Sequence, residues 1–487
     1  MSNDELLSKI NSDDDHFYLI SQTEWKKYSE YAVEVDPDQD DRASQIRLCN
    51  FTRPHMRAFH CSWIGFFIAF FIWFAVAPLL SEIKETLNLE KKQIWTSSIV
   101  GVGGTIFMRF LLGPFCDKVG PRVLFSLVLC LASIPTALIG LTNSALDLTL
   151  LRLFIGAAGG TFVMCQYWTS RMFTKEVVGT ANALVGGWGN LGGGVTQLVM
   201  GSALFPLFKE IFKGSENPAE MAWRTVCVVP AVVAFSIGVF IYYKSDDSPK
   251  GNYNELKKNG AMAEVSAAAS FRDGALNLNT WFLFIQYACC FGVELTMNNA
   301  AALYFKEEFE LTTEEAAAIA SIFGWMNLFA RGLGGYFSDK ANARMGMKGR
   351  LWTQTIFLLC EGALVLVFAN TSDLTGAIVV MVFFSLFVQA AEGSSYGIVP
   401  YVDPPATGAI AGIIGAGGNT GAVCFGLGFR NLDYKDAFVL MGITILASAG
   451  LSVFVCIPGS SKMFWGEDEE KEGKDTLEVP DTEKVEE

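Results

Sequence analysis

The sequence predicts an all-α membrane protein in which twelve transmembrane helices form two pseudo-symmetric six-helix halves. Two observations support this: long apolar stretches recur through the chain, and motifs of the first half recur in the second. Of the 487 residues, 51% are hydrophobic and 39 are phenylalanine, which exceeds the usual composition of soluble domains. The apolar stretches are about 20 residues long, the length that a helix needs to cross a bilayer.

Twelve candidate spans can be delimited along the chain. The first six lie near residues 60–80, 94–116, 123–141, 148–168, 180–207 and 223–243, and the second six near 281–304, 316–337, 351–369, 375–398, 407–428 and 437–457. We therefore divide the chain into an N-terminal tail (1–55), a first half (56–243), a linker (244–278), a second half (279–457) and a C-terminal tail (458–487).

The charged residues predict the orientation of the spans. Residues 1–49 and 458–487 account for the net charge of −14, so the body is balanced and implies no cationic partner or nucleic acid. We expect these apolar-poor tails to be disordered. Basic residues gather in the loops after even-numbered spans, whereas the other loops are neutral or acidic. By the positive-inside rule, the even loops and both termini are cytoplasmic.

The composition offers no support for an enzyme. The 11 cysteines are scattered through apolar stretches without the spacing of a metal site or a disulfide framework. No nucleophile and base are arranged for covalent catalysis. We expect neither a metal nor another cofactor.

Two motifs repeat in the same order in both halves. The first is Arg109, Gly113, Asp117 and Lys118, which recurs with identical spacing as Arg331, Gly335, Asp339 and Lys340. The second is a glycine-rich segment that aligns Gly186 with Gly415, Gly189 with Gly418, Asn190 with Asn419 and Gly192 with Gly421. Such a repeat is typical of secondary transporters with a binding site between two related halves.

The repeated arginines are the candidate substrate ligands. An arginine within a membrane span costs about 2.5–3.5 kcal/mol on insertion scales. Eight helical residues rise about 12 Å, so Arg109 and Arg331 should lie at matched depth inside Asp117 and Asp339. Two guanidinium groups that converge would repel unless an anion lay between them, and a planar oxyanion suits their paired donors. The alternative is that each arginine forms a structural ion pair with Glu294, Glu361 or Glu392.

The glycine-rich segments admit two interpretations. Small residues allow two membrane helices to pack closely. Alternatively, a missing side chain lets the backbone approach the substrate, with Asn190 and Asn419 as neutral hydrogen-bond donors. The two roles are compatible.

The loop that follows the first motif has a recognisable pattern. Gly113, Pro114, Asp117, Lys118, Gly120 and Arg122 resemble the loop between the second and third helices of the major facilitator superfamily. The second copy contains Asp339. The resemblance implies that Asp117, Arg122 and Asp339 form a cytoplasmic gate, whereas the simpler alternative is a solvated turn.

Several separate motifs narrow the resemblance. The paired glycine–asparagine segments, the two arginines, GTFVMCQYW (160–168), FGVELTMNN (291–299) and QAAEGSSYGIVPYV (389–402) are similar to those of the nitrate/nitrite porter family, in its plant and algal high-affinity form. This implies a nitrate transporter of the plasma membrane, with nitrite as a candidate second substrate and a small single-span protein as a candidate partner. Arg109, Arg331 and Asn190 would bind the anion, and Phe162, Tyr287 and Phe291 would line the site unless they only pack.

Proton coupling requires a carrier within the membrane. An intramembrane carboxylate is a functional candidate by default, and Glu294 and Glu392 are available. We favour Glu294, since its span also carries Tyr287 and Phe291; the alternative is a structural role. The resemblance thus predicts proton-coupled nitrate uptake. Exchange of nitrate for nitrite, or a sensor that binds nitrate without transport, remain as alternatives.

Overall fold

The computed structural model describes residues 31–174, 177–258, 267–403 and 407–466, and these contain twelve helical spans long and apolar enough to cross a membrane. Each predicted span overlaps one of them. The first half contains α2 (His55–Phe74), η2 (Ala77–Leu79), α3 (Leu80–Thr86), α4 (Lys91–Val119), α5 (Pro121–Ala137), η3 (Leu138–Leu141), α6 (Ala145–Ile155), η4 (Gly156–Gly160), α7 (Thr161–Met172), α8 (Val178–Thr196), η5 (Gln197–Leu204), α9 (Phe205–Ile211), α10 (Pro218–Val226) and α11 (Val228–Lys244).

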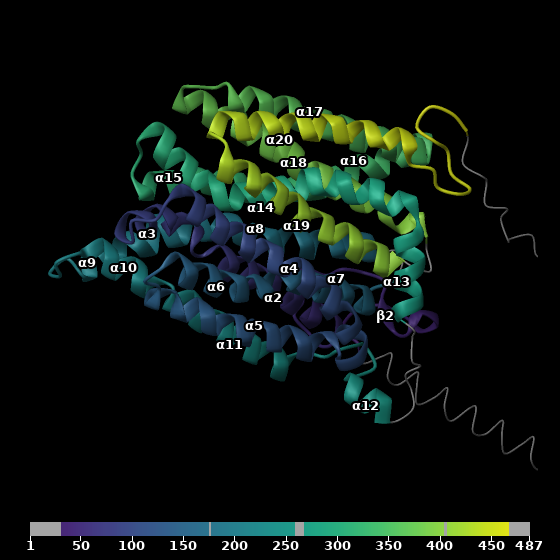
Figure 1. The fold of residues 1–487 in the computed structure, drawn as a ribbon. Coiled ribbons are helices and arrows are strands. Elements are labelled where there is room, and N and C mark those ends of the chain that lie inside the picture. The colour runs from purple at the N-terminus through teal and green to yellow at the C-terminus, as the bar shows by residue number, and fades with distance from the viewer. Residues whose placement is uncertain (1–30, 175–176, 259–266, 404–406, 467–487) are drawn as a thin grey trace, which may run out of the picture.

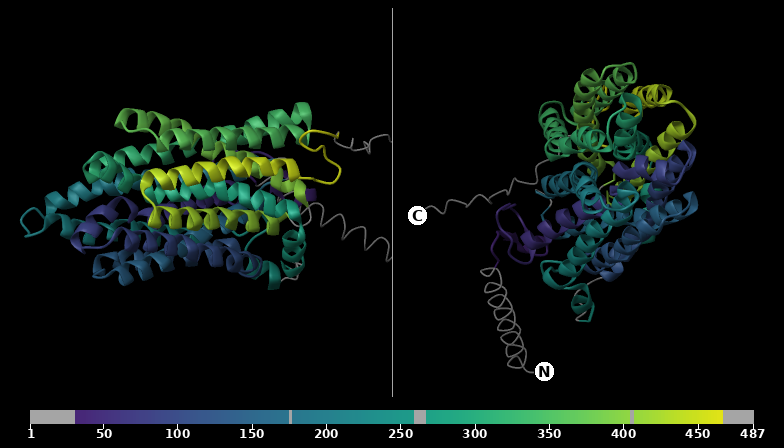
Figure 2. Two further views of the ribbon diagram at one scale, coloured as in Figure 1. Left: turned by 45° about the horizontal axis from the view of Figure 1, so that its top comes forward. Right: turned by 90° about the vertical axis from the view of Figure 1, so that its left-hand side faces the viewer.

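The second half contains α14 (Leu278–Phe309), α15 (Thr313–Trp325), η6 (Met326–Leu328), α16 (Ala330–Met345), α17 (Met347–Ala369), α18 (Leu374–Val402), α19 (Thr407–Asn431), α20 (Tyr434–Ala449) and η8 (Gly450–Phe454). The first half, purple to teal, and the second half, green to yellow, lie side by side with their helices nearly parallel (Figures 1 and 2). Large apolar side chains such as Phe107 and Leu141 are exposed on the outside of the bundle. A lipid environment satisfies such a surface, as expected of a multi-pass membrane protein.

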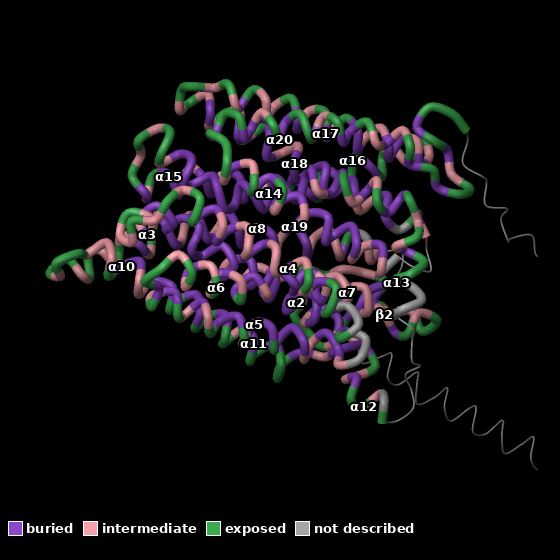
Figure 3. The backbone as a smooth tube through the Cα atoms, in the orientation of Figure 1, coloured by how far each residue is buried: buried purple, intermediate pink, exposed green. Residues whose placement is uncertain are grey.

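The two halves repeat the same helix pairings. In the first half α2 packs on α8, α4 on α6 and α5 on α11; in the second half α14 packs on α19, α16 on α18 and α17 on α20. Between the halves, α4 contacts α19 and α8 contacts α15. Buried residues concentrate along this central region (Figure 3). The motif repeat in the sequence therefore corresponds to a repeat in the packing.

The glycine-rich segments make the first of these pairings possible. A Cβ atom at Gly192 would lie 2.2 Å from the carbonyl oxygen of Phe67, and one at Gly421 would lie 2.1 Å from that of Ala288. Gly189 and Gly418 likewise leave no room beside the rings of Phe66 and Phe291. These four glycines therefore serve close helix packing, as the first interpretation holds.

Residues 31–54 differ from the disordered tail that the sequence predicts. The strands β1 (Val35–Asp36) and β2 (Arg42–Ala43) pair antiparallel around η1 (Pro37–Gln39). Ala43 is fully buried, and its carbonyl oxygen accepts from the Thr174 amide at 3.0 Å. Charge-rich composition did not reveal this docking because individual contacts, such as those of Ala43 with Thr174 and of Arg53 with Asp246, carry it.

The linker also has structure. It contains α12 (Tyr253–Lys258) and α13 (Ala267–Leu276), and α13 contacts α19. Both helices lie at the end of the bundle where β2 lies, opposite α9 and α10 (Figure 1). This is the end to which the charge bias assigns the cytoplasm.

The glycine packing makes a testable prediction. Gly421→Ala should lower the melting temperature, because the Ala288 backbone must move, and overpacking of this kind costs about 1–3 kcal/mol. Thermal unfolding of the purified protein in detergent measures the effect. Gly412→Ala, on the same helix, is the matched control, since a Cβ there meets nothing within 4 Å. Equal melting temperatures for the two variants would contradict the packing role.

Candidate functional site

Arg109 lies buried in α4, near the boundary between the halves. Its Nη1 donates to the Gly415 carbonyl oxygen at 2.6 Å, across the interface, and Nε and Nη2 donate to the Gly159 carbonyl oxygen at 3.4 Å. With the Asn419 amide oriented to satisfy both partners, its oxygen accepts from Nε and Nη1 at 3.1 Å. All these acceptors are neutral, and within the described ranges no carboxylate forms an ion pair with Arg109. These hydrogen bonds stabilise its positive charge, but the described residues supply no negative charge that neutralises it.

Irregular backbone delivers one of these acceptors, the Gly159 carbonyl oxygen. Gly159 lies in η4, a 3₁₀ segment that interrupts the fourth span between α6 and α7. Broken helices of this kind free carbonyl groups to face a membrane-buried site. Gly415 approaches closely because it has no side chain: a Cβ there would lie 3.3 Å from the Phe162 ring and 3.3 Å from the Tyr396 hydroxyl oxygen.

Arg331 lies at the start of α16, just after the 3₁₀ segment η6 interrupts the eighth span. Its Nη1 forms an ion pair with Glu392 Oε2 at 2.6 Å, and its Nη2 donates to the Tyr287 hydroxyl at 3.1 Å. Both charged side chains are at most 5% exposed. Arg331 therefore forms an ion pair with a buried carboxylate, as the alternative interpretation of the repeated arginines predicts. Among the described residues, no carboxylate pairs with Arg109 in this way.

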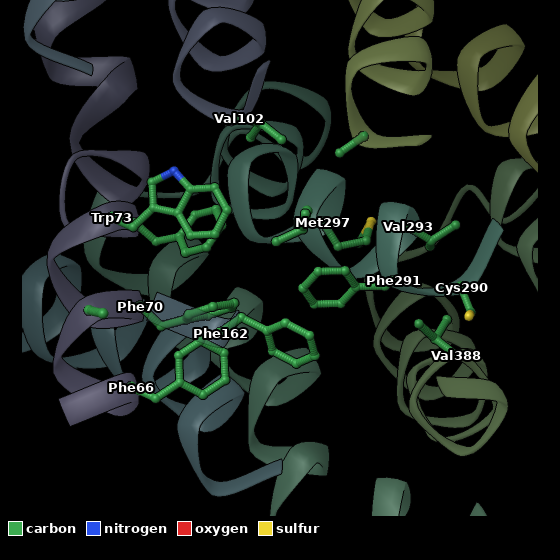
Figure 4. Close-up of a cluster of buried hydrophobic side chains, with 14 of the residues drawn as sticks. Phe66, Phe70, Trp73, Val102, Phe162, Cys290, Phe291, Val293, Met297 and Val388 are labelled. Carbon is green, nitrogen blue, oxygen red and sulfur yellow. The ribbon is translucent and has the colours of Figure 1, made fainter. Parts of the chain in front are cut away.

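Aromatic rings connect the two arginines. The Arg109 guanidinium carbon lies 4.8 Å from the Phe162 ring centre and 5.4 Å from that of Phe291. Phe291 stacks on Tyr287 at 5.3 Å between ring centres, and Tyr287 meets Tyr396 edge-on at 5.2 Å. Figure 4 shows the rings of Phe162 and Phe291 next to each other in the middle of the bundle. The three predicted aromatic residues therefore lie together around the arginines.

Two site residues escaped the sequence analysis. Tyr396 follows Glu392 by four residues, the spacing that places two side chains on one helical face. Its ring centre lies 6.0 Å from the Arg331 guanidinium carbon. Asn327 precedes Arg331 in η6 and donates to Glu294 Oε1 at 2.9 Å. The Glu392–Tyr396 spacing was the available signal for the first, whereas nothing in the sequence distinguished Asn327.

The asparagines of the repeat differ from the expected anion donors. Asn190 donates its amide to Glu294 Oε2 at 3.4 Å, and Asn419 accepts from Arg109. Glu294 is fully buried and also lies within hydrogen-bonding reach of Glu392. Arg331 and Asn190 therefore share one polar network with the two predicted proton-coupling candidates, whereas Arg109 and Asn419 form a separate group of contacts.

Gly186 extends the site toward the first half. A Cβ there would lie 3.8 Å from Arg331 Nε and 3.2 Å from the Gln166 amide nitrogen. The first glycine of each repeat, Gly186 or Gly415, thus borders an arginine, while the later glycines pack helices. Close packing therefore accounts for the later glycines, and an approach of the backbone to the substrate at Gly186 and Gly415 stays a prediction.

The predicted gate residues form local contacts within each half. Arg122 pairs with Asp247 at 3.5 Å, and Asp339 pairs with Arg350 at 2.8 Å. Burial raises the pKa of the Asp247 carboxyl, while Arg122 opposes that rise. The Asp117 side chain lies outside the described residues. Among the residues that are described, no cluster of three or more His, Cys, Asp or Glu could hold a metal ion.

Residues 62–426 match the family model of the Major Facilitator Superfamily. It is 37% identical to the high affinity nitrate transporter 2.5 of Arabidopsis thaliana, covering 89% of this chain and 86% of the relative. It is 35% identical to nitrate transporter 2.2 of Chlamydomonas reinhardtii, covering 92% and 88%. The nitrate/nitrite transporter NrtP of a Picosynechococcus strain is 29% identical, with 75% and 83% covered.

Solved structures show the same fold at low identity. A bacterial homolog of the human lysosomal transporter Spinster, in an inward-facing and occupied conformation, matches with a TM-score of 0.63 at 15% identity. That match covers 82% of this chain and 96% of the Spinster homolog. The likeness supports the arrangement of helices in two halves.

Proposed function

The chain belongs to the nitrate/nitrite porter family of the Major Facilitator Superfamily, and we propose that it is a transporter, not an enzyme, that takes up nitrate together with protons. Nitrite is a second candidate substrate. The proposal places the protein in the plasma membrane with both termini in the cytoplasm, in agreement with the basic loops after even-numbered spans.

The uncompensated charge of Arg109 is the observation that carries the proposal. Neutral oxygens of Gly159, Gly415 and Asn419 occupy its donors. An anion offers the same hydrogen bonds plus an opposite charge, which matters most in a region of low dielectric. Nitrate is planar, so it suits the guanidinium fork, while the Phe162 and Phe291 rings attract the Arg109 cation itself.

Arg331 supplies the second half of the proposed site. In the absence of an anion, Glu392 neutralises it at 2.6 Å. Nitrate that bridges the two arginines competes with Glu392 for the Arg331 guanidinium. When Glu392 takes up a proton, it loses the negative charge that pairs with Arg331. The Arg331 guanidinium is then free to bind nitrate.

This competition couples nitrate to protons. Glu392 Oε1 has no hydrogen-bond donor among the described groups, and Glu294 is its carboxyl neighbour. Two carboxyl groups can share a hydrogen bond only when one of them is protonated. Nitrate alone moves negative charge against a negative-inside potential, at about 2.3 kcal/mol per 100 mV. Two protons per nitrate make the step net positive and favourable.

Nitrate-evoked currents in oocytes test the proposed function. We expect an inward positive current that grows with external acidity, from the chain alone or together with a single-span accessory protein. Electroneutral exchange of nitrate for nitrite would contradict proton symport and favour an antiporter. Nitrate binding without current or uptake in either arm would contradict transport and favour a sensor.

Arg109→Lys tests the anion site. Lysine keeps the charge but loses the fork that reaches Gly159 and Gly415, so uptake at subsaturating nitrate should fall about 10- to 100-fold, the equivalent of one charged hydrogen bond. Uptake of labelled nitrate, normalised to surface protein, is the measurement. Arg224→Lys is the control, since Arg224 pairs with Glu220 at 2.9 Å. Normal uptake by the Arg109 variant would refute the site.

Glu294→Gln tests the carboxyl pair of Glu294 and Glu392 as the proton carrier, in which Glu294 passes the proton to Glu392. The amide still fills the space beside Asn327 but cannot release a proton, so uptake should lose its dependence on external pH while nitrate binding persists. The rate ratio between two external pH values is the measurement. Glu361→Gln is the matched variant, because Glu361 is equally buried but neither of its oxygens has a hydrogen-bond partner in the described structure. An unchanged pH dependence in the Glu294 variant would contradict the assignment, whatever the Glu361 variant shows.

A further inference from the structure

A third buried arginine lies outside the site described above. Arg152, in α6, is 5% exposed. Its Nη1 donates to Ser97 Oγ at 3.0 Å and to Ser98 Oγ at 2.7 Å, and its Nη2 donates to Asn299 Oδ1 at 2.6 Å. Within the described ranges no carboxylate forms an ion pair with Arg152. Like Arg109, it is a buried cation held by neutral oxygens alone.

Arg152 lies between the predicted outer end of the bundle and Arg109. Its partners Ser97 and Ser98 are on α4, 11 to 12 residues before Arg109, which corresponds to about 17 Å along the helix axis. Since Asp117 and the cytoplasmic loop lie beyond Arg109 in the other direction, Arg152 is on the outer side. An anion that enters from outside would reach its depth first.

The hydrogen bond to Asn299 crosses from one half to the other. Arg152 and both serines belong to the first half, whereas Asn299 belongs to α14 of the second. A cavity of about 10 Å³ adjoins this contact, lined by Ser98, Asn299, Thr296 and Trp95 among others from α4, α14 and α19. That volume suffices for about one water molecule. An anion can enter only when the two halves part.

We propose that Arg152 is an outer capture site for the transported anion. When the outer ends of the halves separate, Asn299 moves away with α14 and frees a donor on Nη2, while Ser97 and Ser98 keep the guanidinium oriented. A small oxyanion then binds Arg152. When the halves close, Asn299 returns as a neutral acceptor, displaces the anion and sends it toward Arg109.

This inference rests on the proposed function, since nitrate serves as the probe. The experiment measures nitrate-evoked current against external nitrate at fixed voltage and pH, normalised to surface protein. Arg152→Gln should raise the external half-saturation concentration about tenfold while the maximal current is largely kept. Arg152→Lys should show a smaller rise. Arg224→Gln, which removes a different positive charge, one paired with Glu220, should leave half-saturation unchanged.

Asn299→Ala gives the opposite signature. Without the returning oxygen, the anion stays on Arg152, so half-saturation should fall and the maximal current should fall with it. An arginine that only braces α6 against α4 and α14 would instead lose current in both variants without a change in half-saturation. If the Arg152→Gln variant does not reach the cell surface, the half-saturation concentrations of Arg152→Lys and Asn299→Ala still test the capture site.

Two results would overturn the capture site. One is an unchanged half-saturation in every Arg152 variant that reaches the surface; the other is a higher half-saturation in Asn299→Ala. Both require a wild-type chain that transports nitrate. Absence of nitrate transport by the wild type contradicts the proposed function itself and is therefore distinguishable.

Discussion

The contact between Arg109 Nη1 and the Gly415 carbonyl oxygen, at 2.6 Å, joins the two halves at the centre of the bundle. A guanidinium at this depth must find acceptors or the helix that bears it would not insert stably. The glycine-rich segment of α19 brings a backbone oxygen to it, and the broken fourth span supplies Gly159. One regular helix and one 3₁₀ segment therefore both contribute backbone oxygens to the same buried charge.

The two halves stabilise their buried arginines in different ways. The repeat places Arg109 and Arg331 at equivalent positions, yet among the described residues a carboxylate, Glu392, pairs with Arg331 and none pairs with Arg109. The pseudo-symmetry of the two halves therefore does not extend to the partners of the two arginines. An asymmetric pair of this kind can respond to an anion on one side and to a proton on the other, which a fully symmetric pair could not.

The length of the apolar stretches was enough to locate all twelve spans, though not their ends, because a bilayer sets a minimum apolar length. The motif repeat was enough to identify Arg109 and Arg331 as equivalent residues of the two halves. Neither the apolar stretches nor the motif repeat could show the 3₁₀ segment η6 that precedes Arg331, or the ion pair of Arg331 with Glu392. A short 3₁₀ break does not change the hydropathy of a span. Arg152 was missed since a single arginine near a span end has an ordinary composition, and only the packing shows that Asn299 covers it.

The central claim is that an anion bridges Arg109 and Arg331 by displacing neutral oxygens from one and a carboxylate from the other. A structure determined in saturating nitrate tests it most directly. The account predicts a planar ion within hydrogen-bond reach of both guanidinium groups, with Glu392 withdrawn from Arg331. Nitrate bound elsewhere, with the Arg109–Gly415 and Arg331–Glu392 contacts both intact, would contradict it.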